Sequence, residues 1–294
     1  MDAVPTQARR PAAVDYLALG NPTVDVRPNG IRQIGGSAVY GTLQAARLGL
    51  VAGAVGRGRP DDIDALWKPF AAEADLRLLD APATTMFRNE NLDGQRVQWV
   101  QSSAGALADP GPLPRAKVVH LAPVVAEVDL VTVTERLGEA GADFVGLTPQ
   151  GMVRHWRTDG LVGLRPLAID PAGVRGVDAV VFADYEAPFL EELAALVRGS
   201  GGVVVVTRAD RGCEVRSRTG IQPFPAYPVG RVVDETGAGD VFSASFFTAL
   251  EAGLSMRKAV RLGSAAAAIK IQGIGPDAVG RLDDIAELTG APES

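Results

Sequence analysis

The chain has 294 residues, of which 47% are hydrophobic and 22% are charged, and this composition excludes wholesale disorder. Its net charge is −6, from 29 Lys and Arg against 35 Asp and Glu, and the basic residues are scattered, so nucleic-acid binding is not expected. The lone Cys213 excludes an intrachain disulfide and a cysteine-rich metal site, and the spacing of His120 and His155 argues against a zinc hydrolase or a His-based triad.

The N-terminal segment does not resemble a targeting sequence. Residues 1–13 lack the apolar core of a secretory signal, so we expect a short disordered extension before a domain that spans 14–294. No apolar run approaches the length that a membrane-spanning helix needs. We therefore expect a cytoplasmic protein that does not engage a membrane.

Short apolar runs alternate with helical stretches along most of the chain. Residues 14–20 predict a buried strand, 37–48 a helix rich in small residues, and 51–55 the next strand. Further strands are expected at 118–121, 144–147, 179–182 and 203–207, with a helix at 188–198 between the last two. This alternation is typical of a mainly parallel sheet that helices cover on both faces.

Residues 84–103 break this alternation. Asp93-Gly94 lies between two extended, mostly polar runs, and this pair favours a hairpin because a type I′ turn needs positive φ at both central positions. An isolated polar hairpin has little core of its own. We therefore expect the hairpin to lie over another part of the molecule.

The C-terminal third predicts two consecutive helices, at 240–252 and 256–270. Gly253 is a natural terminator for the first of them, because glycine readily adopts the positive φ found just beyond a helix end. Ser255 can cap the second helix.

Residues 234–242, DETGAGDVF, are the most informative stretch; they follow a strand-like segment at 231–233 and open an almost entirely apolar helix. Gly237, Ala238 and Gly239 leave backbone N–H groups uncovered at a helix N-terminus, which carries a partial charge of about +0.5 and predicts an anion site. Asp240 then places a carboxylate beside that anion, where it could abstract a proton. Alternatively, the glycines only permit a tight turn and Asp240 only caps the helix.

This string resembles the C-terminal signature D-x-T-G-A-G-D-x-F of the ribokinase-like (PfkB) carbohydrate kinases at every fixed position. Other landmarks of that family follow in the right order: Asp25 in GNPTVDV, Gly35-Gly36 before an Ala-rich helix, ADYE at 183–186 for N-x-x-E, and VVVVTRADRG at 203–212 for the nucleotide element. The resemblance covers residues 14–290. It implies a three-layer α/β/α fold with a mainly parallel central sheet and a small β lid from about 27–34 and 84–103.

The resemblance also implies an activity, the transfer of the γ-phosphate of ATP to a hydroxyl. Asp240 would be the base, the amides of Gly237, Ala238 and Gly239 would form the anion hole, and Glu186 would hold Mg²⁺. The residues that it places along the nucleotide are Thr207, Arg208, Gly212, Lys270 and Gly273. A monovalent cation such as K⁺ and a homodimer are further expectations.

Three positions depart from the family pattern. Ala183 replaces the Asn of N-x-x-E, which bears on the metal geometry. Tyr40 replaces the Asn that follows the glycine pair, and Gly56-Arg57-Gly58 replaces the usual G-x-D, and both changes bear on the acceptor.

The acceptor is indicated by HLAP at 120–123, by Q-G-x-x-R with Gln150 and Arg154, and by Tyr40, which together resemble the inositol-kinase branch of the family. The expected acceptor-binding residues are Asp25, Gly35, Gly36, Tyr40, Gln150 and Arg154. Arg154 could instead make only a surface salt bridge, and Trp99 could stack on a substrate or merely shield the cleft. His120 is expected to be a satisfied residue at a strand end.

We therefore expect an ATP-dependent kinase for a sugar, polyol or cyclitol. The alternatives are a nucleoside kinase of the same fold and a catalytically weakened relative that binds ligand as a regulator, which Ala183 alone motivates.

Overall fold

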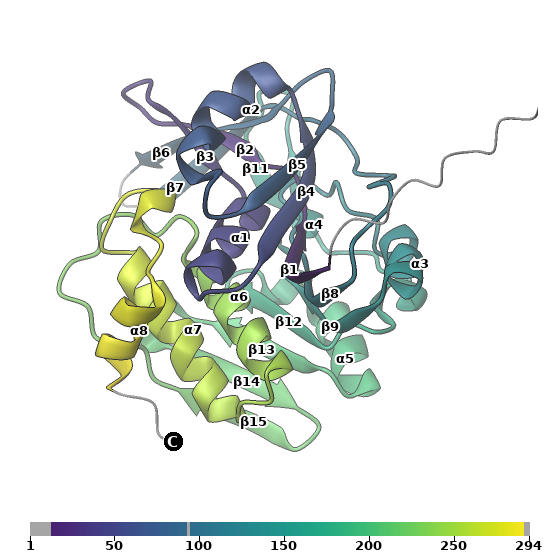
Figure 1. Cartoon of the computed structure of the whole chain (residues 1–294), viewed down its shortest axis with the longest axis vertical. Helices are drawn as coiled ribbons and strands as arrows, with labels where there is room; N and C mark the ends of the chain where they lie inside the picture. Colours follow the sequence, from purple (N-terminus) through teal and green to yellow (C-terminus); the bar gives the residue numbers. More distant parts are fainter. Residues whose placement is uncertain (1–12, 93–94, 291–294) are drawn as a thin grey trace, which may run out of the picture.

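The structure is a computed structural model that describes residues 13–92 and 95–290 (Figure 1). A nine-stranded sheet runs through its centre, and all of its strand pairs are parallel except those of β13 with β14 and of β14 with β15. Its strands, in spatial order, are β15 (Gly220–Phe224), β14 (Cys213–Ser217), β13 (Val203–Thr207), β12 (Ala179–Ala183), β9 (Ala142–Leu147), β8 (Ala116–Leu121), β1 (Val14–Leu19), β4 (Ala52–Gly58) and β5 (Asp75–Asp80).

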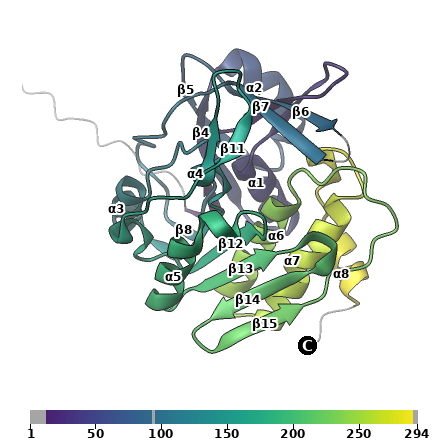
Figure 2. The same cartoon turned by 180° about the vertical axis from the view of Figure 1, so that it is seen from behind.

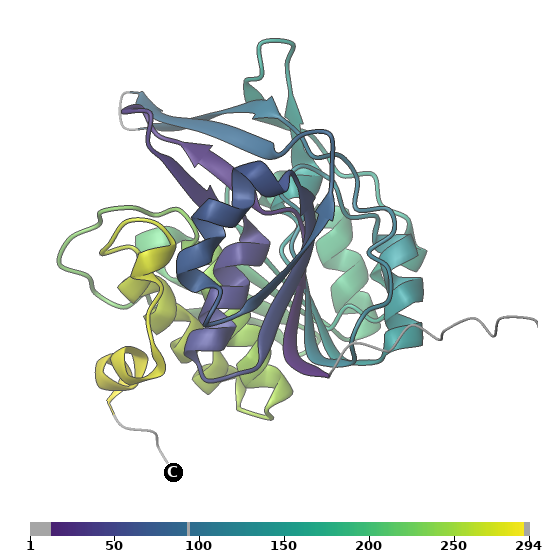
Figure 3. The same cartoon turned by 45° about the horizontal axis from the view of Figure 1, so that its top comes forward.

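Helices lie on both faces of this sheet (Figures 1 and 3). The helices of the described ranges are α1 (Ser37–Arg47), α2 (Pro60–Trp67), α3 (Leu130–Ala140), α4 (Gln150–Val153), α5 (Glu191–Ser200), α6 (Ala238–Glu251), α7 (Met256–Lys270) and α8 (Leu282–Thr289). One core cluster joins α3 and α5 to the sheet, and a second joins α1, α6 and α7 to its other face. The expected ribokinase-like α/β/α architecture is confirmed.

A small second sheet lies beyond one edge of the main sheet (Figure 3). Its strands, in spatial order, are β3 (Arg32–Gly35), β2 (Thr23–Val26), β6 (Thr85–Leu92) and β7 (Gln95–Ser102). The two segments expected to form a lid, 27–34 and 84–103, thus contribute to one sheet, and β2 extends it to Thr23. The turn expected at Asp93-Gly94 lies outside the described residues, as does most of the expected extension at 1–13.

Most expected elements appear within two or three residues of their predicted ends. The helix expected at 188–198 begins later, at Glu191, after a short 3₁₀ turn at Ala187–Phe189. The prediction of a strand-like segment at 231–233 is wrong. The backbone of this segment bonds to the end of α7 instead, where the Val233 N–H donates to the Ile271 carbonyl at 2.7 Å. The small hairpin of β10 (Arg154–Trp156) and β11 (Val162–Leu164) was not expected, because its strands are only three residues long.

Helix α6 is the element that positions the signature sequence. Its residues from Asp240 to Ala249 are all buried, because α6 packs on the sheet on one side and on α7 on the other. A helix that is apolar all round belongs in a core. Gly253, with φ of 78°, ends the turn beyond α6, and the Ser255 side chain caps α7, both as expected. None of the helices in the described ranges is long and apolar enough to cross a membrane.

His120 is a satisfied core residue, as expected. Its Nδ1 lies 2.5 Å from the Tyr16 hydroxyl and its Nε2 lies 2.9 Å from the Thr148 hydroxyl, and the ring is fully buried. Burial lowers the pKa of His120 from 6.5 to about 3. The folded protein therefore holds a neutral imidazole at all pH values above about 3.

This burial predicts a pH dependence of stability. Below pH 6.5 the unfolded chain binds a proton at His120 that the folded protein does not, so the folded state should lose about 1.4 kcal/mol per pH unit as the pH falls from 6.5 towards 3. His120→Gln lacks this titration. Urea unfolding of both proteins at pH 7, 6 and 5 should show the stability difference between them shrinking as the pH falls. A difference that stays constant would contradict the prediction.

Candidate active site

The candidate site forms where the strands of the main sheet end and the small sheet approaches them. Open α/β sheets bind ligands at the carboxyl ends of their strands. The segments after β9 and β12, the N-terminus of α1 and the N-terminus of α6 all lie at that edge (Figures 1 and 2).

The signature turn has the geometry that its glycines predict. Gly237 adopts a left-handed conformation, with φ of 85°, and α6 begins at the next residue. The Ala238 N–H donates to the Glu235 carbonyl at 3.1 Å, and the Thr236 N–H donates to Oδ1 of Asp234 at 3.0 Å. Of the three amides expected to bind an anion, that of Ala238 is therefore already engaged within the turn.

Asp240 lies in the first turn of α6 and is only 8% exposed. Its negative charge contributes to raised pKa values at two neighbours: burial is the main cause for both Tyr16 and Glu186, and Asp240 adds to it. Asp240 therefore acts electrostatically on Glu186, which precedes it by more than fifty residues in the sequence.

Glu186 is buried directly after β12. Its Oε2 accepts the Ala183 N–H at 2.9 Å, and burial raises its pKa, while the charge of Arg154 acts against the rise. Asp184, which could have substituted for the missing Asn, pairs with Arg211 instead. No group of three His, Cys, Asp or Glu side chains that could hold a metal occurs in the described parts of the chain.

Gln150 and Arg154 both follow β9, Gln150 as the first residue of α4 and Arg154 as the first residue of β10. The Gln150 Nε2 donates to the Ser37 hydroxyl at 2.5 Å, and its Oε1 accepts from the Arg154 guanidinium at 3.0 Å. Arg154 also donates to the Val124 carbonyl at 3.1 Å and lies 5.6 Å from the centre of the Phe87 ring. Arg154 is therefore part of an internal polar network and is not a surface salt bridge.

The glycine pair lies beside Asp25. A Cβ on Gly35 would lie 2.6 Å from Oδ2 of Asp25, and Gly36 has φ of 97° at the N-terminus of α1. Asp25 is 8% exposed and accepts a hydrogen bond from the Thr23 hydroxyl at 3.2 Å. The close approach to Asp25 therefore explains Gly35, and the positive φ explains Gly36. Asp25 lies near the carboxyl edge of the main sheet.

The two faces of the small sheet differ. Asp25 pairs with Phe87, which pairs with Val100, so these three side chains lie on one face, where Phe87 and Val100 pack on Val124. Trp99 is the next residue in β7 and therefore lies on the opposite face, paired with Arg88. The possibility that Trp99 stacks on a substrate beside Asp25 is thus not supported.

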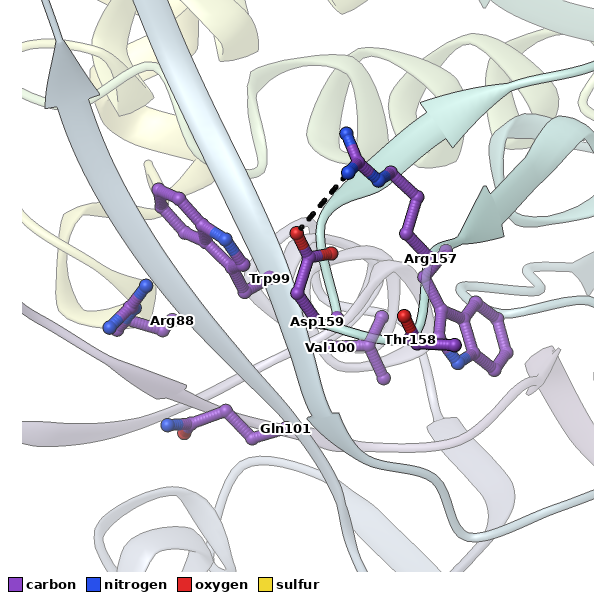
Figure 4. Close-up of a pocket in the computed structure, with 9 residues that line it drawn as sticks. Arg88, Trp99, Val100, Gln101, Arg157, Thr158 and Asp159 are labelled. Carbon is purple, nitrogen blue, oxygen red and sulfur yellow. Dashed lines mark ion pairs between the residues drawn. The ribbon is translucent and has the colours of Figure 1, made fainter.

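Trp99 instead borders a separate cavity of about 490 Å³ (Figure 4). The Arg88 guanidinium lies 4.2 Å from the centre of its ring, and the Arg157–Asp159 ion pair in the β10–β11 turn borders the cavity. The cavity is lined by Arg88, Trp99, Val100, Gln101, Trp156, Arg157, Thr158, Asp159 and Gly160. The Val100 N–H donates to the Gly160 carbonyl at 2.9 Å, so the segment that carries Arg154 is tied to the edge of the small sheet.

Tyr40 and Lys270 are placed differently from expectation. Tyr40 is 1% exposed, and a Cβ on Gly237 would lie 2.5 Å from its ring. The Tyr40 ring therefore packs against the signature turn. Lys270 is fully buried, and its Nζ donates to the Asp234 carbonyl at 3.1 Å. Its side chain therefore points to the signature turn, where the resemblance had implied a place along the nucleotide.

The remaining residues expected along the nucleotide lie at the end of β13 and beyond α7. The Thr207 hydroxyl donates to the Phe182 carbonyl at 3.4 Å, and Arg208 pairs with Glu214 at 2.5 Å. Gly212 has φ of 82° and lies against the Phe224 carbonyl, so only glycine suits it. Gly273, whose N–H donates to the Lys270 carbonyl at 3.3 Å, begins the turn after α7.

Glu127 is a buried residue that sequence reasoning missed. Its carboxylate accepts the N–H groups of Asn21 at 3.0 Å, Val124 at 2.9 Å and Val125 at 2.7 Å. Glu127 thereby connects the loop after β8 to the chain that follows β1. The same loop accepts a hydrogen bond from Arg154 at the Val124 carbonyl. Nothing in the local pattern PVVAEV marks it, because its partners are defined by the fold.

Three comparisons agree with this architecture. Residues 184–280 match the model of the pfkB family carbohydrate kinase. The chain is 23% identical over 273 residues, 85% of this chain and 93% of the other, to the cytidine kinase of Thermococcus kodakarensis. A solved ribokinase of Arabidopsis thaliana, complexed with ribose and ATP, superimposes with a TM-score of 0.75 at 19% identity, covering 95% of this chain and 100% of that one.

A further solved structure is a pyrophosphate-dependent kinase in the ribokinase family, complexed with a pyrophosphate analog and myo-inositol. It superimposes with a TM-score of 0.76 at 21% identity, covering 92% of this chain and 98% of that chain. These similarities establish a ribokinase-like fold for this chain.

Proposed function

We propose that this protein, which has a ribokinase-like fold, is a kinase that transfers a phosphoryl group to a hydroxyl of a cyclitol, polyol or sugar. The observation that carries the proposal is the buried Asp240 carboxylate in the first turn of α6, directly after the glycine turn. The charge of Arg154, one of the proposed acceptor-binding residues, lowers the pKa of Glu186, and the charge of Asp240 raises it.

In the proposed reaction Asp240 accepts the proton of the acceptor hydroxyl. The hydroxyl oxygen forms a bond to the terminal phosphorus of the donor, and the bond from that phosphorus to the leaving phosphate oxygen breaks. The amides of Gly237 and Gly239 bind the transferring group at the N-terminus of α6, and the Ala238 amide joins them if its bond within the turn opens. Phosphoryl transfer depends mainly on such positioning and charge neutralisation.

The proposed donor is ATP with Mg²⁺. Thr207, Arg208, Gly212 and Gly273 would line the nucleotide, as the family resemblance implies. Glu186 would help to hold the ion, whose remaining ligands would be phosphate oxygens and water, as is usual for Mg²⁺. The metal would neutralise charge on the donor phosphates. Because one structural neighbour is pyrophosphate-dependent, pyrophosphate is the alternative donor to test.

A polyhydroxylated ring is the acceptor that the polar network favours. Each hydroxyl both donates and accepts, and Asp25, Gln150 and Arg154 provide acceptors and donors together. A nucleoside usually needs an aromatic slot for its base. Trp99 lies on the other face of the small sheet, and the Phe87 ring is 3% exposed and faces Arg154. The similarity to a cytidine kinase keeps a nucleoside as the second candidate.

The test is a panel of acceptors offered with either ATP or pyrophosphate. We expect kcat/KM to be higher for myo-inositol or a hexose than for ribose, cytidine or adenosine, measured as ADP or phosphate release and as phosphorylated product. A nucleoside at the top of the ranking would promote the second candidate. No transfer to any acceptor, with ligand binding retained, would favour a weakened relative, although the intact Asp240 argues against it.

Asp25→Ala is expected to lower kcat/KM for the preferred acceptor by roughly tenfold to a hundredfold. Losing one buried hydrogen-bonding partner of a ligand costs about 1–3 kcal/mol. Asp159→Ala is the matched control, because Asp159 borders the separate cavity beside Trp99. Equal acceptor kinetics for the two variants would remove Asp25 from the acceptor site.

A further inference from the structure

Lys270 is an unusual residue for the interior of a protein. It is the last residue of α7, it is fully buried, and its ammonium donates to the Asp234 carbonyl oxygen at 3.1 Å. The ammonium also lies 5.7 Å from the centre of the Tyr40 ring. Burying a charge is costly unless it is paired or hydrogen-bonded. The charge of Lys270 must therefore be compensated by the groups around it, and those groups indicate its role.

Two neighbours of Lys270 belong to, or pack against, the turn that would hold the phosphoryl group. Asp234 begins the signature sequence, and its Oδ1 accepts the Thr236 N–H at 3.0 Å. Tyr40, on α1, lies near the ammonium and packs directly against Gly237. Lys270 thus contacts both the chain that enters the turn and the ring that supports the turn from below.

Each oxygen of Asp234 accepts at least one hydrogen bond from within the protein, and cationic side chains provide two of these bonds. The backbone carbonyl accepts from Lys270, Oδ1 accepts from Thr236, and Oδ2 accepts from Arg27 at 2.9 Å and from the Gly275 N–H at 3.1 Å. Burial alone would raise the pKa of Asp234, but these hydrogen bonds and the charge of Lys270 hold it below its usual value. The group around Asp234 consists of donors, and two of them are cations.

This arrangement does not fit the monovalent cation that the family resemblance implies, at least beside the signature turn. We propose that the Lys270 ammonium is a built-in cation that positions the Asp234–Thr236–Gly237 turn, so that phosphoryl transfer needs no soluble K⁺. Lys270 is a positioning residue, because it acts through Asp234 and Tyr40 and not on the reacting atoms. The inference rests on the proposed function, but it also concerns the stability of the turn in the free protein.

The experiment compares the wild-type protein with Lys270→Met, which keeps a long unbranched side chain and removes the charge. Lys258→Met is the matched control, because Lys258 lies exposed on the same helix. Each protein is measured in KCl, NH₄Cl and tetramethylammonium chloride at equal ionic strength. The readouts are kcat, the acceptor KM and the thermal unfolding midpoint.

The wild type and Lys258→Met should behave identically in the three salts. Lys270→Met should lose about tenfold to a hundredfold in kcat in tetramethylammonium chloride with little change in acceptor KM, as a small misplacement of catalytic groups does. Ammonium or K⁺, which are small enough to enter the vacated space, should restore part of kcat and raise the unfolding midpoint of this variant alone.

Two results would overturn the inference: a wild-type protein that requires K⁺ or NH₄⁺, or a Lys270→Met protein that no small cation activates or stabilises. If Lys270→Met does not fold, the salt response of the wild type and of Lys270→Arg decides instead, since both retain a cation and should show none. If the wild type phosphorylates no acceptor, the proposed function fails, while the unfolding midpoints still test the role of Lys270.

Discussion

Asp240→Asn is expected to lower kcat by about 10²–10⁴-fold, because the amide keeps the shape of the side chain but cannot accept the acceptor proton, and general-base contributions are of that order. The KM for the donor should change little, since the amides of the turn remain. The measurement is steady-state kinetics with the best acceptor, together with donor binding by calorimetry.

Asp143→Asn is the control for this experiment. Asp143 lies near the start of β9, at the opposite end of the strand from Gln150, where it pairs with Arg115 on the surface. Its replacement should leave kcat unchanged. If Asp240→Asn keeps a kcat near that of the wild type, Asp240 is not the base and the proposed mechanism is wrong.

Gly237→Ala should be the most damaging single-methyl change in the signature turn. The residue has φ of 85°, which costs an L-residue about 1–2 kcal/mol, and the new Cβ would lie 2.5 Å from the Tyr40 ring, where overpacking costs about 1–3 kcal/mol more. We expect a loss of roughly 2–5 kcal/mol of unfolding free energy, from the sum of these two ranges, and a large loss of activity as the turn shifts.

Gly239→Ala is the matched comparison for stability. Gly239 lies within α6, and no heavy atom that would contact an added Cβ lies within 4 Å. Alanine favours a helix interior, so this variant should be as stable as the wild type or slightly more stable. Urea unfolding of both variants measures the difference. Equal destabilisation of the two variants would show that contact with Tyr40 and positive φ do not explain Gly237.

Several structural features were predictable because they depend on residues close together in the sequence. The strand at Val203–Thr207 and the helix at Met256–Lys270 follow from their apolar patterns and flanking residues, and the structure matches both. The turn at the N-terminus of α6 follows from the T-G-A-G-D string in the same way.

Other features depend on residues far apart in the sequence, and local patterns carry no signal for them. The segment at 231–233 has the composition of a strand, but its nearest partner is the end of α7, so no strand forms. Trp99 lies on the outer face of the small sheet because the pairing with β6 sets the orientation of every side chain in β7. The sequence of the hairpin alone leaves both faces possible.

What the sequence by itself determined is therefore the chemistry available at the site: a carboxylate after a glycine turn, and a polar set suited to hydroxyl groups. The tertiary structure decided which side chains lie beside one another around the signature turn. Tyr40 and Lys270 come from helices more than two hundred residues apart, and both pack beneath Gly237 and Asp234. Their roles arise because close packing in the interior assigns each buried side chain one set of neighbours, and those neighbours are set by the whole fold.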